Sequence, residues 1–210
     1  MDEIEVAVRA VTTVGPETIA LELETPTDFD AKPGQFVRLY GTVDGEEIAR
    51  YYTLSSPDVE ETFEITVGVD PEGDLSPWLA DREVGDTLRI EGPFGSVAYE
   101  DGDVVVLAGG PGVGPAVGIA EAAVETGNDA AIVYQDDVPA HEQRLDALVE
   151  AGADVTIIGE GTEAFAAAVA SVVDEGQLYV FGFQSFVEAA RDAVTDAGGD
   201  FDAAAVESFG

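Results

Sequence analysis

The hydrophobic pattern changes its period near residue 100, and this change constrains the fold more than any other feature. Before it, apolar residues alternate with polar ones, as at Ile4, Val6 and Val8. After it, residues 104–107 form a continuous apolar run. Alternation is typical of half-buried antiparallel strands, and a continuous run is typical of a parallel strand covered on both faces. The chain therefore predicts two domains of different class, joined within residues 98–103.

The first half predicts short strands separated by glycine and proline turns. We expect a short helix over residues 76–81, with Pro77 in its first turn. Six strands with such turns are typical of an antiparallel barrel or sandwich. The expected strands begin near Ile4 and then cover residues 19–23, 35–40, 48–54, 63–67 and 87–91.

The second half alternates strands with helices. Units of this size predict an open parallel sheet with helices on both faces. The expected strands cover residues 104–107, 130–134, 154–158, 178–181 and 203–207, and the expected helices cover residues 115–126, 140–151, 163–173 and 185–197.

The charge is strongly negative, with 44 acidic residues against 8 basic ones and a formal net charge of −36. Such a chain repels itself at ordinary ionic strength, and the repulsion becomes local when salt is high. We interpret the acidity as adaptation to the salt-rich cytoplasm of a halophile. A basic partner is the alternative, although the acids are spread over the whole chain. Nucleic-acid binding is disfavoured because phosphates would meet no basic patch.

Residue types exclude several other classes of site. The chain has no cysteine, so disulfides, thiolate zinc sites and cysteine-ligated clusters are excluded within it. The single histidine, His141, is expected to lie on the surface of a helix, and no metal site is predicted. The acidic, alternating N-terminus does not resemble a signal peptide, and no membrane insertion is expected. These features predict a cytoplasmic protein.

A glycine-rich turn stands between the first strand and the first helix of the second half. It reads Gly109-Gly110-Pro111-Gly112-Val113-Gly114-Pro115. Glycines here let the backbone approach a phosphate, and the N-terminus of the next helix presents free N–H groups to an anion. The turn favours nucleotide binding, although tight packing of strand against helix would also explain it.

The segment Arg50-Tyr51-Tyr52-Thr53 is the second chemical signal. A guanidinium can meet a phosphate, an aromatic ring can stack on a planar cofactor, and a hydroxyl can reach a ring nitrogen. Taken alone, the segment is better explained by a strand with a buried tyrosine and a surface arginine.

Together, these signals resemble the ferredoxin–NADP reductase family, in the same order along the chain. Arg50, Tyr52 and Thr53 resemble its Arg-x-Tyr-Ser/Thr motif. Gly110 to Pro115 is similar to its nucleotide loop. Four shorter matches are residues 33–37 (Pro-Gly-Gln-Phe-Val), 73–76 (Gly-Asp-Leu-Ser), 92–95 (Gly-Pro-Phe-Gly) and the ending 207–210 (Glu-Ser-Phe-Gly).

The resemblance implies a six-stranded antiparallel Greek-key barrel that binds FAD in residues 1–99, and a five-stranded parallel, Rossmann-like domain that binds NADH or NADPH in residues 100–210. Arg50 would neutralise pyrophosphate, Tyr52 would stack on the flavin, and Thr53 would bond near flavin N5. Tyr52, Thr53 and Phe209 are the implied catalytic residues. The other implied cofactor-binding residues are Leu54, Ser55, Val67, Gly73, Asp74, Leu75, Ser76, Gly110, Gly112, Val113, Gly114, Pro115, Asp136, Phe181 and Gly182.

The chain departs from the family pattern at three places. Gly68 stands where the family often has a basic residue. Phe181-Gly182 stands where many members have Cys-Gly, so either the nicotinamide pocket differs or Phe181 is simply core. Tyr134-Gln135-Asp136-Asp137 stands where NADPH-specific members have arginines. Carboxylates there favour NADH or are further surface acids, and Arg144 keeps NADPH open.

The implied activity is hydride transfer from NAD(P)H to bound FAD, followed by electron transfer to a ferredoxin or another redox carrier. A flavin-binding subunit that relays electrons within a complex, without its own nucleotide chemistry, is an alternative. A cofactor-free interaction module is a second alternative. The physiological acceptor and the oligomeric state stay open.

Overall fold

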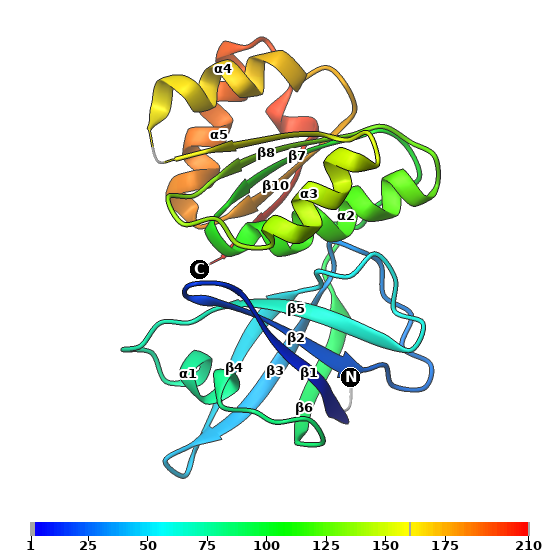
Figure 1. The fold of residues 1–210 in the computed structure, drawn as a ribbon, viewed down its shortest axis with the longest axis vertical. Coiled ribbons are helices and arrows are strands. Elements are labelled where there is room, and N and C mark those ends of the chain that lie inside the picture. The colour runs from blue at the N-terminus through cyan, green and yellow to red at the C-terminus, as the bar shows by residue number, and fades with distance from the viewer. Residues whose placement is uncertain (1–2, 160, 210) are drawn as a thin grey trace.

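The structure is a computed structural model, and it describes residues 3–159 and 161–209. It contains two sheets that follow one another along the chain (Figure 1). One is antiparallel with six strands, and the other is parallel with five. This confirms the predicted fold class.

The first sheet forms the barrel, in the strand order β4-β3-β6-β1-β2-β5. A bridge between Leu54 and Ile65 brings the two ends of the sheet together. The alternating apolar residues point inward and form a single core that includes Val8, Leu39 and Phe63. The elements are β1 Ile4–Gly15, β2 Thr18–Glu24, β3 Phe36–Val43, β4 Glu46–Thr53, β5 Thr62–Gly68, α1 Leu75–Ala80 and β6 Thr87–Phe94.

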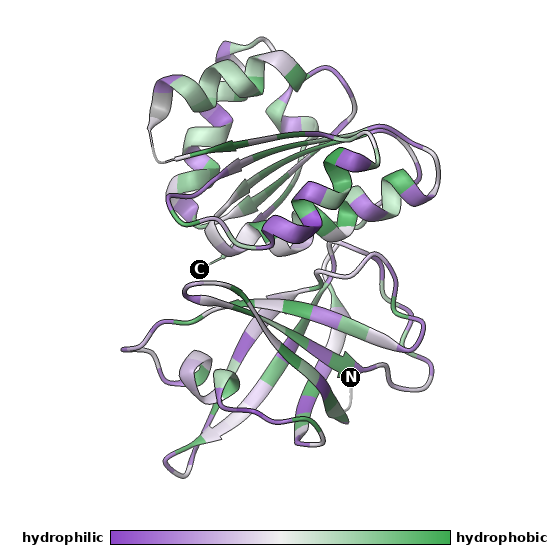
Figure 2. Ribbon diagram, in the orientation of Figure 1, coloured by the Kyte–Doolittle hydropathy of each residue, from purple (hydrophilic) through white to green (hydrophobic). Residues whose placement is uncertain are grey.

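The second sheet has the strand order β11-β10-β7-β8-β9, with buried apolar residues on both faces. Figure 2 shows hydrophobic central strands between the helices, with hydrophilic segments on α3 and α5 and a mainly hydrophobic α4. The elements are β7 Val104–Gly109, η1 Gly110–Gly112, α2 Val113–Glu125, β8 Ala130–Gln135, α3 Glu142–Glu150, β9 Asp154–Ile158, α4 Thr162–Val172, β10 Gln177–Gly182, α5 Gln184–Asp196, η2 Phe201–Ala203 and β11 Ala205–Ser208.

Two short 3₁₀ turns shift predicted boundaries. The glycine-rich turn becomes η1, so α2 begins at Val113 instead of residue 115. Before the last strand, the Asp200 carboxylate accepts a hydrogen bond from the Asp202 N–H and stabilises η2. The last strand therefore begins at Ala205 instead of residue 203.

Candidate functional site

The side chains of Arg50 and Tyr52 lie on one face of β4, the strand at the edge of the barrel sheet. Tyr52 pairs with Val37 and Arg50 pairs with Leu39 across β3. Opposite residues of an antiparallel pair share a face, and Val37 and Leu39 are fully buried in the barrel. Arg50 and Tyr52 therefore stand on the inner face of this edge strand.

Helix α1 lies beside the same two strands (Figure 1). A Cβ atom on Gly41 of β3 would lie 2.4 Å from Leu75, so α1 packs against the face that carries Arg50. In the turn before α1, the Gly73 N–H donates to the Asp70 carbonyl at 3.0 Å, and the Ser76 hydroxyl accepts from the Asp70 N–H at 3.1 Å. The Asp74 side chain does not cap the N-terminus of α1, and helix N-terminal amides without a cap can meet an anion.

Arg50 has no ion-pair partner among residues 3–159 and 161–209, although the chain has 44 acidic residues. It is exposed and donates to the neighbouring Ala49 carbonyl at 2.9 Å. A guanidinium without a carboxylate partner can pair with an anionic ligand. The other arginines all form ion pairs, namely Arg9, Arg38, Arg82, Arg89, Arg144 and Arg191.

The residues around Tyr52 differ in what they can offer a ligand. Burial raises the pKa of Tyr52 to about 12, against the opposing effect of Arg50, so its phenol is neutral. Thr53 is 8% exposed. The Leu54 and Val67 side chains are buried in the barrel core and leave only backbone groups. The buried Ser55 hydroxyl donates to Glu64 at 2.8 Å.

Packing accounts for two of the three predicted loop glycines. A Cβ atom on Gly112 would lie 2.2 Å from the Phe181 carbonyl oxygen, and one on Gly114 would lie 2.4 Å from Thr66 Oγ1 of the barrel. Gly110 differs, because its φ of 55° lies in the left-handed region and its Cβ position faces open space. Among the described residues, no side chain caps η1 or α2. The buried Val113 and Pro115 side chains leave only backbone to a nucleotide.

The other predicted nucleotide residues lie at the carboxyl ends of β8 and β10. The Asp136 carboxylate accepts from the Tyr134 hydroxyl at 3.0 Å and from the Val138 N–H at 2.8 Å, so it closes the turn after β8. Phe181 is fully buried. A Cβ atom on Gly182 would lie 2.6 Å from Phe186.

Phe209 lies beside the end of β10. Its N–H donates to the Gly182 carbonyl at 2.9 Å, and its ring meets Phe183 edge-on at 6.2 Å between centroids. Figure 1 shows this end of the chain on the side of the α/β domain that faces the barrel. Gly210, the last residue of the resembling motif, lies outside the described residues.

The prediction for His141 is wrong. Its side chain is 3% exposed instead of lying on a surface, because it packs between the two domains. The Nε2 atom lies 2.8 Å from Thr66 Oγ1 of the barrel, and the His141 N–H donates to the Val14 carbonyl at 2.8 Å. Nothing in the local sequence around His141 indicates this contact, because it depends on how the domains meet.

Arg144, which the sequence left open as a ligand for the NADPH 2′-phosphate, is occupied elsewhere. Its guanidinium donates to both Glu121 oxygens at 2.8 and 2.6 Å, to Glu64 at 2.7 Å and to the Ser55 carbonyl at 2.6 Å. Glu64 and Ser55 belong to the barrel, so Arg144 joins the two domains. Sequence reasoning missed this role because Glu64 reads as an ordinary outward residue of an alternating strand.

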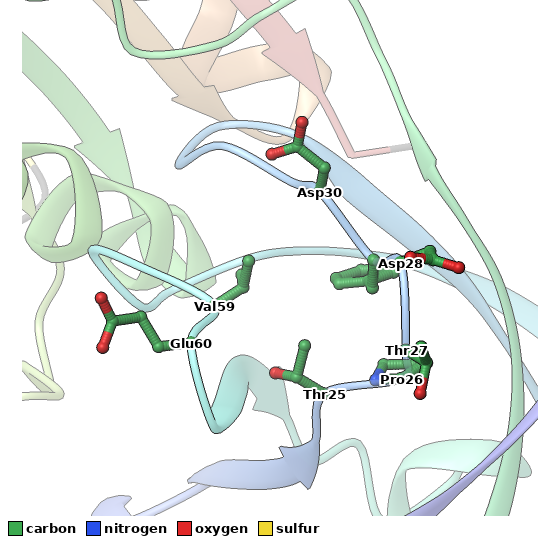
Figure 3. Close-up of a pocket in the computed structure, with 8 residues that line it drawn as sticks. Thr25, Pro26, Thr27, Asp28, Asp30, Val59 and Glu60 are labelled. Atoms are coloured by element: carbon green, nitrogen blue, oxygen red, sulfur yellow. The ribbon is translucent and has the colours of Figure 1, made fainter.

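A separate cavity of about 540 Å³ lies between the loops after β2 and before β5. Figure 3 shows the Asp28, Asp30 and Glu60 carboxylates spread apart instead of converging on one point. The described residues also contain no group of three or more histidine, cysteine or acidic side chains placed to hold a metal ion. None of the predicted cofactor residues lines this cavity, which Thr25, Pro26, Thr27, Asp28, Phe29, Asp30, Val59 and Glu60 surround.

A barrel followed by an α/β domain, with the two predicted cofactor regions on separate domains, defines the ferredoxin reductase-like fold. Residues 5–99 match the family described as the oxidoreductase FAD-binding domain. The FAD/NAD-binding domain of the Vibrio cholerae nitric oxide dioxygenase is similar in structure, with a TM-score of 0.84, 21% identity and 100% coverage of both chains. A Neisseria gonorrhoeae ferredoxin NADP⁺ reductase, solved with bound FAD and NADP, has a TM-score of 0.80, 19% identity and 100% coverage of both chains.

Two named relatives are similar in sequence. The glycine betaine monooxygenase reductase subunit of Chromohalobacter salexigens is 42% identical over 103 residues, which cover 47% of this chain and 28% of the relative. The NADH-cytochrome b5 reductase 1 of Aspergillus fumigatus is 32% identical over 154 residues, which cover 64% of this chain and 50% of the relative. The chain thus spans half or less of either relative. Within the described residues, no helix is both long and apolar enough to cross a membrane.

Proposed function

We propose that this chain is an FAD-dependent oxidoreductase that accepts hydride from NADH or NADPH and passes electrons to an acceptor. The observation that carries the proposal is Arg50, left without a carboxylate partner in the described part of a chain of net charge −36. The uncapped start of α1 lies beside the same strand face. A guanidinium without a carboxylate partner, beside an uncapped helix start, suits a pyrophosphate.

The residues present fit such a cofactor. Arg50 and the amides at the start of α1 would hold the pyrophosphate, and the neutral Tyr52 ring would lie against the flavin. Thr53 would bond near the reacting edge of the flavin. When bound, FAD supplies the hydride-accepting and electron-donating chemistry, and the protein supplies orientation and electrostatics. The match of residues 5–99 to an FAD-binding family supports this assignment.

The nucleotide would bind on the α/β domain at Gly110 and the first turn of α2. Hydride transfer then requires that the two bound rings be held in near contact. We propose NADH as the preferred donor, since Asp136 lies at the end of β8 and the Arg144 guanidinium is already bonded to carboxylates. The acceptor would be a redox carrier, with a ferredoxin as one choice. The acidity supports a salt-rich cytoplasm as the site of action.

Anaerobic reduction tests this function. Protein purified in concentrated KCl is expected to be yellow, and excess NADH is expected to bleach its flavin. A protein that cannot be loaded with FAD would refute the proposal. A yellow protein that neither NADH nor NADPH bleaches would instead indicate an electron-relay subunit.

Replacing Arg50 tests FAD binding independently of flavin reduction. The Arg50→Ala variant is expected to lose FAD at least about tenfold more readily, because a charge-assisted contact to phosphate contributes about 1.5–3 kcal/mol. FAD retention is measured by absorbance after dialysis, and folding by circular dichroism. Arg9→Ala is the matched control, since Arg9 is half-exposed on β1 and pairs with Glu24 at 2.9 Å. Equal retention in both variants would contradict the role of Arg50.

A further inference from the structure

A cluster of charged and polar groups joins the barrel to the α/β domain, and the proposed function does not use it. We call it the domain clamp, made of Arg144, Glu121, Glu64 and Ser55. Arg144 lies on α3, Glu121 on α2 and Glu64 on β5. The three charged side chains are only 24%, 23% and 24% exposed. They are therefore poorly screened by solvent, and their geometry is tightly specified.

The clamp holds the segments that carry both halves of the proposed site. The Arg144 Nη2 atom donates to the carbonyl of Ser55, which follows Thr53 by two residues at the end of β4. The same guanidinium makes a bidentate contact to Glu121 at 2.8 and 2.6 Å. Glu121 lies on α2, whose first residues belong to the glycine-rich turn. The Arg144 side chain thus bonds both to the barrel, where the flavin is proposed to bind, and to the α/β domain, where the nucleotide is proposed to bind.

Close packing around the clamp leaves α2 little freedom to move. A Cβ atom on Gly118 would lie 2.9 Å from the Ser55 carbonyl carbon, so the helix backbone rests directly on the barrel. His141 adds contacts to Thr66 and Val14 beside it. Packed interfaces of this kind have few alternative arrangements, so a change in the clamp is expected to change the angle between the domains.

Arg144 is the only cation of the domain clamp, and it holds the Glu64 and Glu121 carboxylates together. Burial raises the pKa of Glu64, Arg144 opposes that rise, and the neighbouring Glu121 adds to it. Without the guanidinium, two largely buried carboxylates would face each other with no cation between them, and they would relax by moving apart. Because one carboxylate belongs to each domain, this relaxation would open the interface.

We propose that Arg144 is a positioning residue that sets how closely a nucleotide on the α/β domain approaches a flavin on the barrel. The inference rests on the proposed function, because it concerns the rate of flavin reduction by that nucleotide. Arg144 itself takes no part in the hydride transfer. The side chain acts by fixing α2 against the end of β4.

The test compares Arg144→Met with Arg191→Met. Arg191 is the matched control, because it is a half-exposed arginine of the same domain that pairs weakly with Asp202 at 3.9 Å. Arg144→Met is expected to keep its FAD and its half-saturating NADH concentration, while flavin reduction at saturating NADH slows roughly ten- to hundredfold. Arg144→Lys should recover only part of the rate, since lysine keeps the charge but lacks the planar fork. Arg191→Met should match the unmodified protein.

Calorimetry gives a readout that does not depend on the reaction. The unmodified protein is expected to unfold in one transition, and Arg144→Met in two, because its domains are uncoupled. Should Arg144→Met fail to fold, Glu121→Gln weakens the same contact and is expected to slow reduction in the same direction.

Three results would overturn the inference. The first is a reduction rate in folded, FAD-loaded Arg144→Met equal to that of the control. The second is a rate loss that only follows FAD loss. The third is an unmodified protein that binds FAD but is not reduced by NADH or NADPH. That last result removes the proposed function as well, so the two failures are distinguishable.

Discussion

At the scale of single residues, His141 shows how the domain interface controls a titratable group. Its side chain is 3% exposed, and burial together with the nearby Arg144 charge lowers its pKa to about 3. The unfolded chain binds a proton below pH ~6.5 that the native protein resists. His141 therefore contributes stability that is fully present above pH ~6.5 and is lost as the pH falls toward 3.

The expected result is a pH-dependent difference between the unmodified protein and His141→Asn. Asparagine tolerates the left-handed backbone at this position, where φ is 57°. Across the acid window, the His141 contribution should make the free energy of unfolding fall by up to about 1.4 kcal/mol per pH unit more steeply in the unmodified protein. Urea unfolding at fixed KCl measures this. Glu64, whose raised pKa has the opposite effect, is common to both proteins. Parallel curves would contradict the assignment.

The sequence predicted the residues that lie within local motifs. It did not predict the residues whose role depends on the contact between the two domains. Arg50, Tyr52 and Gly110 could be singled out because a strand motif and a turn motif surround them. His141, Glu64 and Arg144 carry no such signal, because their contacts between the two domains join segments more than seventy residues apart. The roles of the predicted cofactor residues stay predictions until ligand binding is measured.

At the scale of elements, the strands and helices could be predicted well, and their ends less so. Period-two alternation located all six barrel strands, and β9 begins and ends where expected. The 3₁₀ turn at Gly110–Gly112 could not be predicted, because its shape depends on the Phe181 carbonyl packed against Gly112. Turn composition alone does not say which residue of a distant strand will fill the space beside a glycine.

The packing of helix α2 against the barrel predicts the effect of a substitution at Gly114 on stability. Gly114→Ala would raise helix propensity by up to about 1 kcal/mol, yet its Cβ atom would lie 2.4 Å from Thr66 Oγ1 and 2.5 Å from Thr66 Cβ. We expect a net loss of about 1–3 kcal/mol, because overpacking at a docked interface forces backbone shifts. Denaturant unfolding measures the loss.

Gly110→Ala is the control for that measurement. Its Cβ position faces open space, so only the left-handed backbone conformation opposes the substitution, at about 1 kcal/mol. A Gly114→Ala variant as stable as the unmodified protein, or more stable than Gly110→Ala, would show that Gly114 does not pack against Thr66 of the barrel.

At the scale of the whole molecule, repulsion between the acidic side chains destabilises the folded protein at low salt. The net charge of −36 is spread over both domains, and each domain has only a few arginines. Most ion pairs lie within one domain and are partly exposed, as at Arg9–Glu24, so salt weakens them. The Arg144 clamp between the domains is largely buried and is less sensitive to salt. Added salt should therefore relieve long-range repulsion more than it weakens the contacts that join the domains.

The thermal midpoint is consequently expected to rise with KCl. Between roughly 0.1 and 1 M, the screening length falls from about 10 Å to about 3 Å, which removes repulsion between carboxylates that are not neighbours. Calorimetry at several KCl concentrations measures the midpoint, with sucrose at equal osmolality as the control for solvent exclusion. If repulsion dominates, KCl should raise the midpoint more than sucrose, and most steeply at low concentration. A midpoint that is flat or falls with KCl would mean that the acidic surface does not limit stability, and it would favour a basic partner as the reason for the charge.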